Sequence, residues 1–137
     1  MWEYEHQATT SATPEAIYRL WSNVGTWHNW NPDVVRAELD GPFAAGSHIV
    51  MTTTQDTIHL RLAEVEENRS FVDEVKLDGV LVRTIHRLQA LENGLTLVTY
   101  RMEITGPGVD QLGPEIGPAI TGDFPDTIAS LVEYAER

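Results

Sequence analysis

The sequence predicts a single α+β domain over residues 1–137, with one strand, two short helices, six antiparallel strands and a long terminal helix. Apolar residues recur with a period of two from residue 34 to residue 105, and short turns separate these runs, as in an antiparallel meander. Spacings of three and four, typical of amphipathic helices, occur before and after that region. A chain of 137 residues is long enough to enclose one hydrophobic core.

The first segment, residues 2–10, alternates apolar and polar residues and is predicted to be a half-buried strand. Thr13 is expected to cap a helix that has Pro14 at its first position. The apolar stripe of this helix consists of Ile17, Leu20, Trp21 and Val24. The segment "TWHNWN", residues 26–31, is predicted to form a second short helix that Pro32 stops.

Six strands are predicted at residues 34–39, 46–54, 57–65, 70–77, 80–91 and 95–105. Asp78-Gly79 between two apolar runs is the strongest hairpin signal of the chain. A second hairpin turn is expected at "ENG", residues 92–94. The terminal helix is predicted from about Pro114 to Ala135, with a kink at Pro125. Its inward stripe consists of Ile116, Ile120, Phe124, Ile128 and Leu131.

Two glycines in this helix, Gly117 and Gly122, are unfavourable in a helix interior by about 1 kcal/mol each. Their presence indicates that something approaches the helix closely there, and a bound ligand is the expected occupant. The preceding "GPGVDQLGP", residues 106–114, is predicted to be a mobile loop that acts as a lid.

The hairpin turns fix which side chains share a face of the sheet, because side chains alternate along a strand. The second hairpin places Leu88 opposite Val98, and therefore His86 opposite Tyr100 and Thr84 opposite Met102. The first hairpin places Asp73 opposite Thr84 and Phe71 opposite His86. An inward polar cluster is therefore predicted, consisting of Asp73, Thr84, His86 and Tyr100.

This cluster has three interpretations. The four groups form a network in which they satisfy one another, as buried polar groups normally do. Alternatively, they orient a ligand at the bottom of an apolar cavity. In the third interpretation they are catalytic: His86, with its pKa raised by Asp73, is a general base and Tyr100 is the acid, for enolisation or aldol cyclisation of a poly-β-ketone.

Several classes of site are disfavoured by the composition. The net charge of −12 disfavours binding to nucleic acid and to anionic membranes. The chain has no cysteine, and its five histidines lack metal-binding spacing, so neither a metal nor a cofactor is expected. Residues 1–10 do not resemble a signal peptide and no apolar run could span a membrane, so a cytoplasmic protein without membrane insertion is expected. His6, His48 and His59 are expected on solvated positions of the sheet.

Two segments resemble a known superfamily: "TPEAIYRLWSNVGTWHNWNPDVVRAELDGPFAAGS" and "FPDTIASLVEYAE". They are similar to the START-like helix-grip proteins, which include the birch-pollen-allergen-like proteins and the polyketide cyclase/dehydrase and lipid transport group. The resemblance covers essentially the whole chain. It implies a seven-stranded curved antiparallel sheet wrapped around the terminal helix, with a cavity between them. It also implies that Trp27 and Trp30 form a structural corner, with His28 and Asn29 facing water.

The function expected from this resemblance is binding of a small or medium hydrophobic molecule, such as a polyketide, a lipid or an aromatic compound. The expected ligand-binding residues are Leu60, Phe71, Val82, Thr84, His86, Leu88, Tyr100, Met102, Ile116, Gly117, Ile120, Phe124 and Trp27. Two alternatives stay open: a cyclase or aromatase that uses Asp73, His86 and Tyr100, and a protein-interaction or chaperone-like module with a filled cavity. A homodimer is compatible with each of them.

Overall fold

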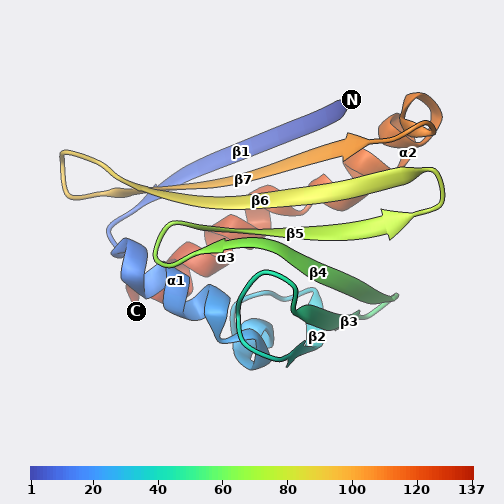
Figure 1. The fold of residues 1–137 in the computed structure, drawn as a ribbon. Coiled ribbons are helices and arrows are strands. Elements are labelled where there is room, and N and C mark those ends of the chain that lie inside the picture. The colour runs from blue at the N-terminus through green and yellow to red at the C-terminus, as the bar shows by residue number, and fades with distance from the viewer.

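The computed structural model describes residues 1–137 as one antiparallel sheet with helices on one face (Figure 1). The strands are β1 (Trp2–Thr10), β2 (Val34–Asp40), β3 (His48–Thr53), β4 (Thr57–Glu66), β5 (Ser70–Leu77), β6 (Val80–Ala90) and β7 (Thr96–Thr105). Their order in the sheet is β1-β7-β6-β5-β4-β3-β2, so β1 and β2 form the two edges. The predicted seven-stranded helix-grip architecture is confirmed.

Two short helices, α1 (Pro14–Ser22) and the 3₁₀ helix η1 (Val24–Asn29), connect β1 to β2. The Thr13 hydroxyl accepts a hydrogen bond from the Ala16 N–H at 3.1 Å, which confirms the predicted cap. Ile17 and Trp21, on the predicted apolar stripe, are completely buried. This packing places α1 against one end of the sheet.

Both predicted hairpins are confirmed in position and register. Leu77 pairs with Val80 across Asp78-Gly79, where Gly79 has a φ of 85° that favours glycine. Across the second turn, Leu88 pairs with Val98 as predicted. The faces of β5, β6 and β7 therefore match the alternation of the sequence.

The terminal helix is bent into two segments, α2 (Val109–Thr121) and α3 (Phe124–Glu136), separated at Gly122-Asp123. In Figure 1, α2 begins beside the end of β7, and α3 lies behind the central strands. The predicted start at Pro114 was wrong, because residues 109–113 are already helical and the predicted lid loop shrinks to residues 106–108. The helix bends at Gly122-Asp123, slightly before the predicted kink at Pro125. Pro125 occupies the first turn of α3, where its missing N–H costs little.

The group that approaches Gly117 closely is a side chain of the protein and not the expected ligand. The indole ring of Trp2, on edge strand β1, lies against α2 at Gly113 and Gly117. A Cβ atom at Gly117 would stand 2.6 Å from three atoms of this ring. Gly117 therefore accommodates Trp2 in this structure, while Gly122 lies exposed at the bend.

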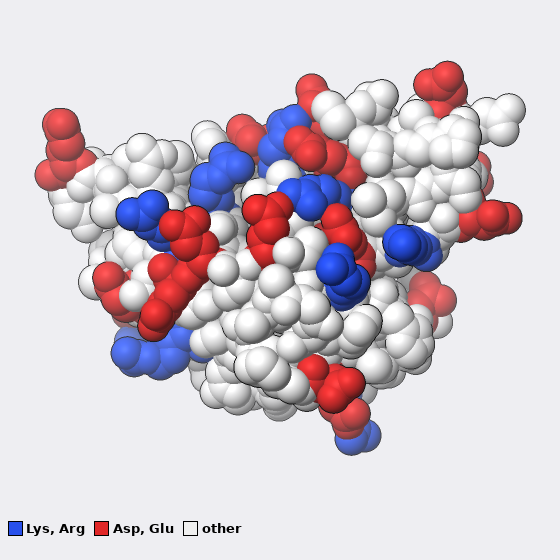
Figure 2. All heavy atoms as spheres, in the orientation of Figure 1, with Lys and Arg blue, Asp and Glu red and all other residues white.

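The outer face of the sheet carries a band of mixed charges, visible across the middle of Figure 2. Arg83 pairs with Glu64 and Glu74, and Arg101 pairs with Glu3 and Glu103. The opposite, inner face is mainly apolar and packs against the helices. Asp73 is an exception, because it is an acidic residue on the inner face.

Candidate functional site

The tryptophan-rich corner is a scaffold that positions α1 and η1. Trp27 and Trp30 are each only 5% exposed, and their rings lie 6.3 Å apart. The Trp27 indole N–H donates a hydrogen bond to the Trp21 carbonyl at 2.9 Å. His28 and Asn29 between them are exposed, as expected. The Trp30 indole N–H is buried without a hydrogen-bond partner.

The predicted inward polar cluster is present. Asp73 of β5 pairs with Thr84 of β6, and His86 of β6 pairs with Tyr100 of β7. All four side chains belong to buried residues, with exposed fractions between 4% for Tyr100 and 9% for Thr84. Three neighbouring strands thus bring a carboxyl, a hydroxyl, an imidazole and a phenol together under α1 and α3.

These four groups do not satisfy one another, so the interpretation as a mutually bonded network is wrong. The closest approach between Asp73 and His86, from Oδ2 to Nε2, is 4.0 Å, which is too long for a hydrogen bond. His86 uses its other nitrogen, Nδ1, to contact the Phe71 carbonyl at 3.1 Å. Tyr100 accepts a hydrogen bond from the Trp21 indole N–H at 3.2 Å. The Asp73 carboxyl, the Thr84 hydroxyl and His86 Nε2 have no hydrogen-bond partner in the protein, but unlike the Trp30 indole N–H they are not fully shielded from solvent.

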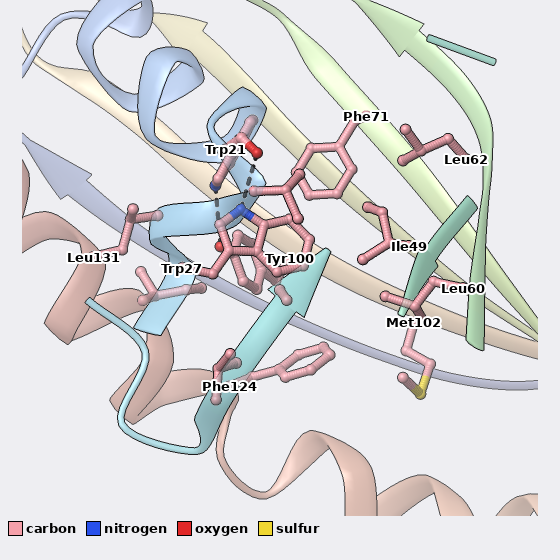
Figure 3. Close-up of a cluster of buried hydrophobic side chains, with 14 of the residues drawn as sticks. Trp21, Trp27, Ile49, Leu60, Leu62, Phe71, Tyr100, Met102, Phe124 and Leu131 are labelled. Carbon is pink, nitrogen blue, oxygen red and sulfur yellow. Dashed lines mark hydrogen bonds between the residues drawn. The ribbon is translucent and has the colours of Figure 1, made fainter. Parts of the chain in front are cut away.

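Several aromatic rings contact the cluster, and those of Trp21, Phe71, Tyr100 and Phe124 are among the core side chains drawn in Figure 3. The Phe71 ring stacks on the His86 imidazole, with centroids 3.8 Å apart and planes inclined by 7°. Trp21 approaches both rings edge-on, and Tyr100 contacts His86 edge-on at 4.6 Å. Phe124, the first residue of α3, packs against Tyr100 with centroids 5.8 Å apart. The polar groups therefore lie in surroundings of low polarity.

Burial shifts the pKa values of the three titratable groups in the directions that favour their uncharged forms. Burial, with a smaller contribution from the charge of Glu74, raises the pKa of Asp73 to about 7. Burial lowers the pKa of His86 to about 3, although the hydrogen bond to the Phe71 carbonyl partly opposes this. Burial also raises the pKa of Tyr100, an effect that the Trp21 hydrogen bond partly offsets.

These directions contradict the expectation that Asp73 raises the pKa of His86. An imidazole with a pKa of about 3 is uncharged at neutral pH and is a weak base. Asp73 is instead the group of the cluster that titrates near neutral pH. The raised pKa of Tyr100 keeps its hydroxyl protonated, so its hydrogen stays available for donation while its oxygen accepts from Trp21.

Most of the other predicted lining residues belong to the same core. Buried together are Leu60, Phe71, Val82, Leu88, Met102, Phe124 and Trp27, while Ile116 is half-buried against them. The assignment of Ile120 was wrong, because 41% of this residue is exposed at the surface of α2. Gly117 is covered by Trp2.

One inward residue was missed by the sequence analysis. His6 was expected on a solvated face, but it is half-buried and pairs with Tyr100 across β1 and β7. The signal was present in the sequence: His6 alternates in phase with Trp2 and Tyr4, which face the helices. His48 and His59 are exposed, as expected.

Two pockets lie away from the cluster. The larger, about 440 Å³, opens between the start of α1 and the β4–β5 turn and is lined by Pro14, Glu15, Glu67, Asn68, Arg69, Leu88, Gln89 and Ala90. The smaller, about 130 Å³, lies beside Trp2 and the start of α2. Around the cluster itself, packed side chains occupy much of the space where a wide cavity was expected.

No group of three or more His, Cys, Asp or Glu side chains is arranged to hold a metal ion. No helix combines the length and the apolar character needed to cross a membrane.

Comparison with solved structures supports the fold at low sequence identity. The di-domain ARO/CYC BexL from the BE-7585A biosynthetic pathway is 21% identical with a TM-score of 0.77, over 99% of this chain and 47% of that one. A START superfamily protein from Mycobacterium smegmatis is 16% identical with a TM-score of 0.70, over 99% and 98% of the two chains. Ara h 8.0201 is 12% identical with a TM-score of 0.70, over 97% and 96%.

The sequence itself was compared with protein families and with curated proteins. No curated protein matches it significantly. Residues 1–136 match the family described as polyketide cyclase / dehydrase and lipid transport. The match extends over nearly the whole chain and agrees with the seven-stranded sheet and bent terminal helix. The chain therefore belongs to the polyketide cyclase/dehydrase and lipid transport family.

Proposed function

We propose that this protein binds a small or medium apolar organic molecule between the sheet and α3, with its polar end at Asp73, Thr84, His86 and Tyr100. The observation that carries the proposal is the gathering of these groups on the apolar inner face of the sheet, where the Asp73 carboxyl, the Thr84 hydroxyl and His86 Nε2 make no hydrogen bond within the protein. Polar atoms that border an apolar interior normally have hydrogen-bond partners. A ligand with a polar end could supply the missing partners.

The apolar part of such a ligand would contact the rings and aliphatic side chains around the cluster. Removal of apolar surface from water supplies affinity at about 25 cal/mol per Å². The Asp73 and His86 side chains each keep 10% of their surface exposed, so they border open space. The polar groups would orient the molecule, as in most apolar binding sites.

Access requires a movement, because Phe124 covers Tyr100 at the bend between α2 and α3. The bend contains Gly122, and only one residue, Asp123, separates it from α3. A small rotation of α3 at this point would withdraw Phe124 and enlarge the space beside the cluster. Bends that absorb such changes are common next to ligand sites.

The test is native mass spectrometry of the purified protein, with extraction and identification of any bound molecule, followed by a thermal-shift screen of polyketide-like and lipid-like compounds. A true ligand at about 100 times its Kd stabilises the native state by about 2.7 kcal/mol. Tyr100→Phe removes one hydroxyl of the site and should reduce this shift. Arg87→Ala, on the outer face, is the control that leaves it unchanged.

A second candidate function is acid–base catalysis in the same site, for example cyclisation of a poly-β-ketone. The observation that favours it is the pKa of Asp73, about 7, which suits a proton acceptor at neutral pH. Tyr100 would donate a hydrogen bond to the substrate oxygen that gains negative charge. Asp73→Asn should abolish turnover of a poly-β-ketone analogue while binding persists; undiminished turnover would exclude this role.

A third candidate is a protein-interaction module, favoured by the packed interior around the cluster. It predicts no response to any small molecule in the screen and a stable protein partner in pull-down experiments. The thermal-shift screen therefore separates it from the first two candidates.

A further inference from the structure

We propose that the polar end of the ligand is an uncharged hydroxyl group, which lies between Asp73 and His86 and donates its hydrogen bond to His86 Nε2. This inference rests on the proposed binding function and specifies its ligand class as an alcohol or a phenol on an apolar skeleton.

The hydrogen bond on the far side of the imidazole defines which nitrogen faces the site. His86 Nδ1 lies 3.1 Å from the Phe71 carbonyl oxygen, and a carbonyl oxygen can only accept. Nδ1 therefore carries the proton. In an uncharged imidazole, Nε2 then has a free lone pair and is a hydrogen-bond acceptor. This nitrogen has no donor from the protein.

The distance between Nε2 and Asp73 Oδ2 suits a single bridging atom. At 4.0 Å the two atoms are too far apart to bond directly. An oxygen that makes two hydrogen bonds of about 2.8 Å would reach both, with an angle of about 90° at the bridge. A hydroxyl can accept from the protonated Asp73 carboxyl and donate to Nε2 at the same time.

Other polar groups fit this position less well. A ketone or an ether oxygen has no hydrogen to donate to Nε2. A carboxylate or phosphate would need a nearby cation, but the arginines of the central strands, Arg83, Arg87 and Arg101, alternate onto the outer face of the sheet. An anion beside Asp73 would therefore be buried without a positive partner, which is costly.

The aromatic surroundings favour a flat skeleton behind the hydroxyl. Phe71 stacks on His86, and Trp21, Tyr100 and Phe124 surround this pair with their rings. Aromatic rings pack well edge-to-face or offset against such groups. A hydroxylated aromatic compound combines the required donor with this shape.

The test compares four probes of similar size by tryptophan fluorescence or calorimetry: 2-naphthol, 2-methoxynaphthalene, naphthalene and 2-naphthoate. 2-Naphthol should bind about tenfold more tightly than 2-methoxynaphthalene and naphthalene, and 2-naphthoate should bind most weakly. Equal binding of naphthalene and 2-naphthol would overturn the inference but preserve the proposed function. Absence of binding for all four would reject the proposed function and, with it, this inference.

A variant comparison locates the hydroxyl. His86→Phe keeps an aromatic ring against Phe71 and removes the Nε2 acceptor. It should lower the affinity for 2-naphthol to that for naphthalene, whereas His59→Phe on the exposed outer face should change neither. Retention of the 2-naphthol preference in His86→Phe would overturn the inference.

A measurement on the unmodified protein covers the case in which His86→Phe does not fold. Nitrogen-15 NMR of the histidine rings distinguishes a protonated from an unprotonated ring nitrogen. The Nδ1–H tautomer of His86 is expected, with its Nε2 resonance shifting when 2-naphthol is added. An Nε2–H tautomer, or an Nε2 resonance unaffected by bound 2-naphthol, would contradict the proposal.

Discussion

The carboxyl of Asp73 and the imidazole of His86 lie 4.0 Å apart, and burial shifts their pKa values in opposite directions. Both shifts have the same physical cause, because a buried environment disfavours the charged form of either group. The pair therefore consists of a carboxyl that holds its proton and an imidazole that resists gaining one. This relationship determines how stability depends on pH.

The two groups contribute to stability in opposite senses. The pKa of Asp73 rises from 3.8 to about 7, so its contribution is complete below pH 3.8 and is lost as the pH rises through 7. The pKa of His86 falls from 6.5 to about 3, so its contribution is complete above pH 6.5 and is lost as the pH falls through 3. Between pH 4 and 6.5 the stability contributed by Asp73 falls with pH while that contributed by His86 rises, so the two pH dependences largely cancel.

Removing one group should reveal the contribution of the other. As the pH rises from 4 to 7, the stability of Asp73→Asn relative to the wild type should increase, because the variant lacks the Asp73 contribution that the wild type loses over this range. As the pH rises from 3 to 6.5, the stability of His86→Phe relative to the wild type should decrease, because the variant lacks the His86 contribution that the wild type gains over this range. Each change should amount to a few kcal/mol at most, on the order expected for pKa shifts of this size. Urea denaturation at several pH values measures both, and curves parallel to the wild type would contradict the assigned shifts.

The contact between Trp2 and Gly117 predicts a coupled effect on stability. Gly117→Ala places a Cβ atom 2.6 Å from the indole ring, so it should destabilise the protein by about 1–3 kcal/mol. In a Trp2→Ala background the same substitution should instead stabilise by up to about 1 kcal/mol, because alanine favours the helix. A double-mutant cycle of thermal unfolding measures this coupling, and additive effects would show that the contact is unimportant.

Trp27 and Trp30 provide a matched pair of substitutions in the structural corner. Trp27→Phe loses the hydrogen bond to the Trp21 carbonyl, whereas Trp30→Phe removes an N–H that has no partner. The first variant should therefore be less stable than the second by about 1 kcal/mol. Chemical denaturation provides the comparison, and the reverse order of stability would argue against it.

Phe124 should control access to the cluster. Phe124→Ala removes a ring that covers Tyr100 and should cost about 3–5 kcal/mol of stability. It should also increase the association rate of 2-naphthol. Leu131→Ala, a fully buried site further along α3, should cost about 2–5 kcal/mol without this increase. Stopped-flow fluorescence compares the two variants, and equal association rates would indicate a different entrance.

Much of the site was predictable because two hairpins dominate it. Asp78-Gly79 and the turn at residues 92–94 fix the register of β5, β6 and β7, and strict alternation then assigns every side chain to a face. This is why the inward positions of Asp73, Thr84, His86 and Tyr100 followed from the sequence. His6 obeyed the same rule, although its phase with Trp2 and Tyr4 was overlooked.

The terminal helix was predicted less accurately because its sequence carries conflicting local signals. Pro114, Pro118 and Gly117 are all unfavourable in a helix interior, yet α2 continues through them. Packing against β1 and β7 stabilises the helix there, and the contact with Trp2 comes from the opposite end of the chain. A local pattern contains no information about such a distant partner.

The sequence by itself determined the fold class, the register of β5, β6 and β7 and the inward polar cluster, because each depends on alternation and short turns. Only the tertiary structure decided that the cluster groups do not bond one another, that His86 Nδ1 faces the Phe71 carbonyl, and that burial keeps Asp73 protonated up to about pH 7. Hydrogen bonds and pKa shifts depend on distances and on the exclusion of water, which arise only when α1, α3 and the sheet pack together.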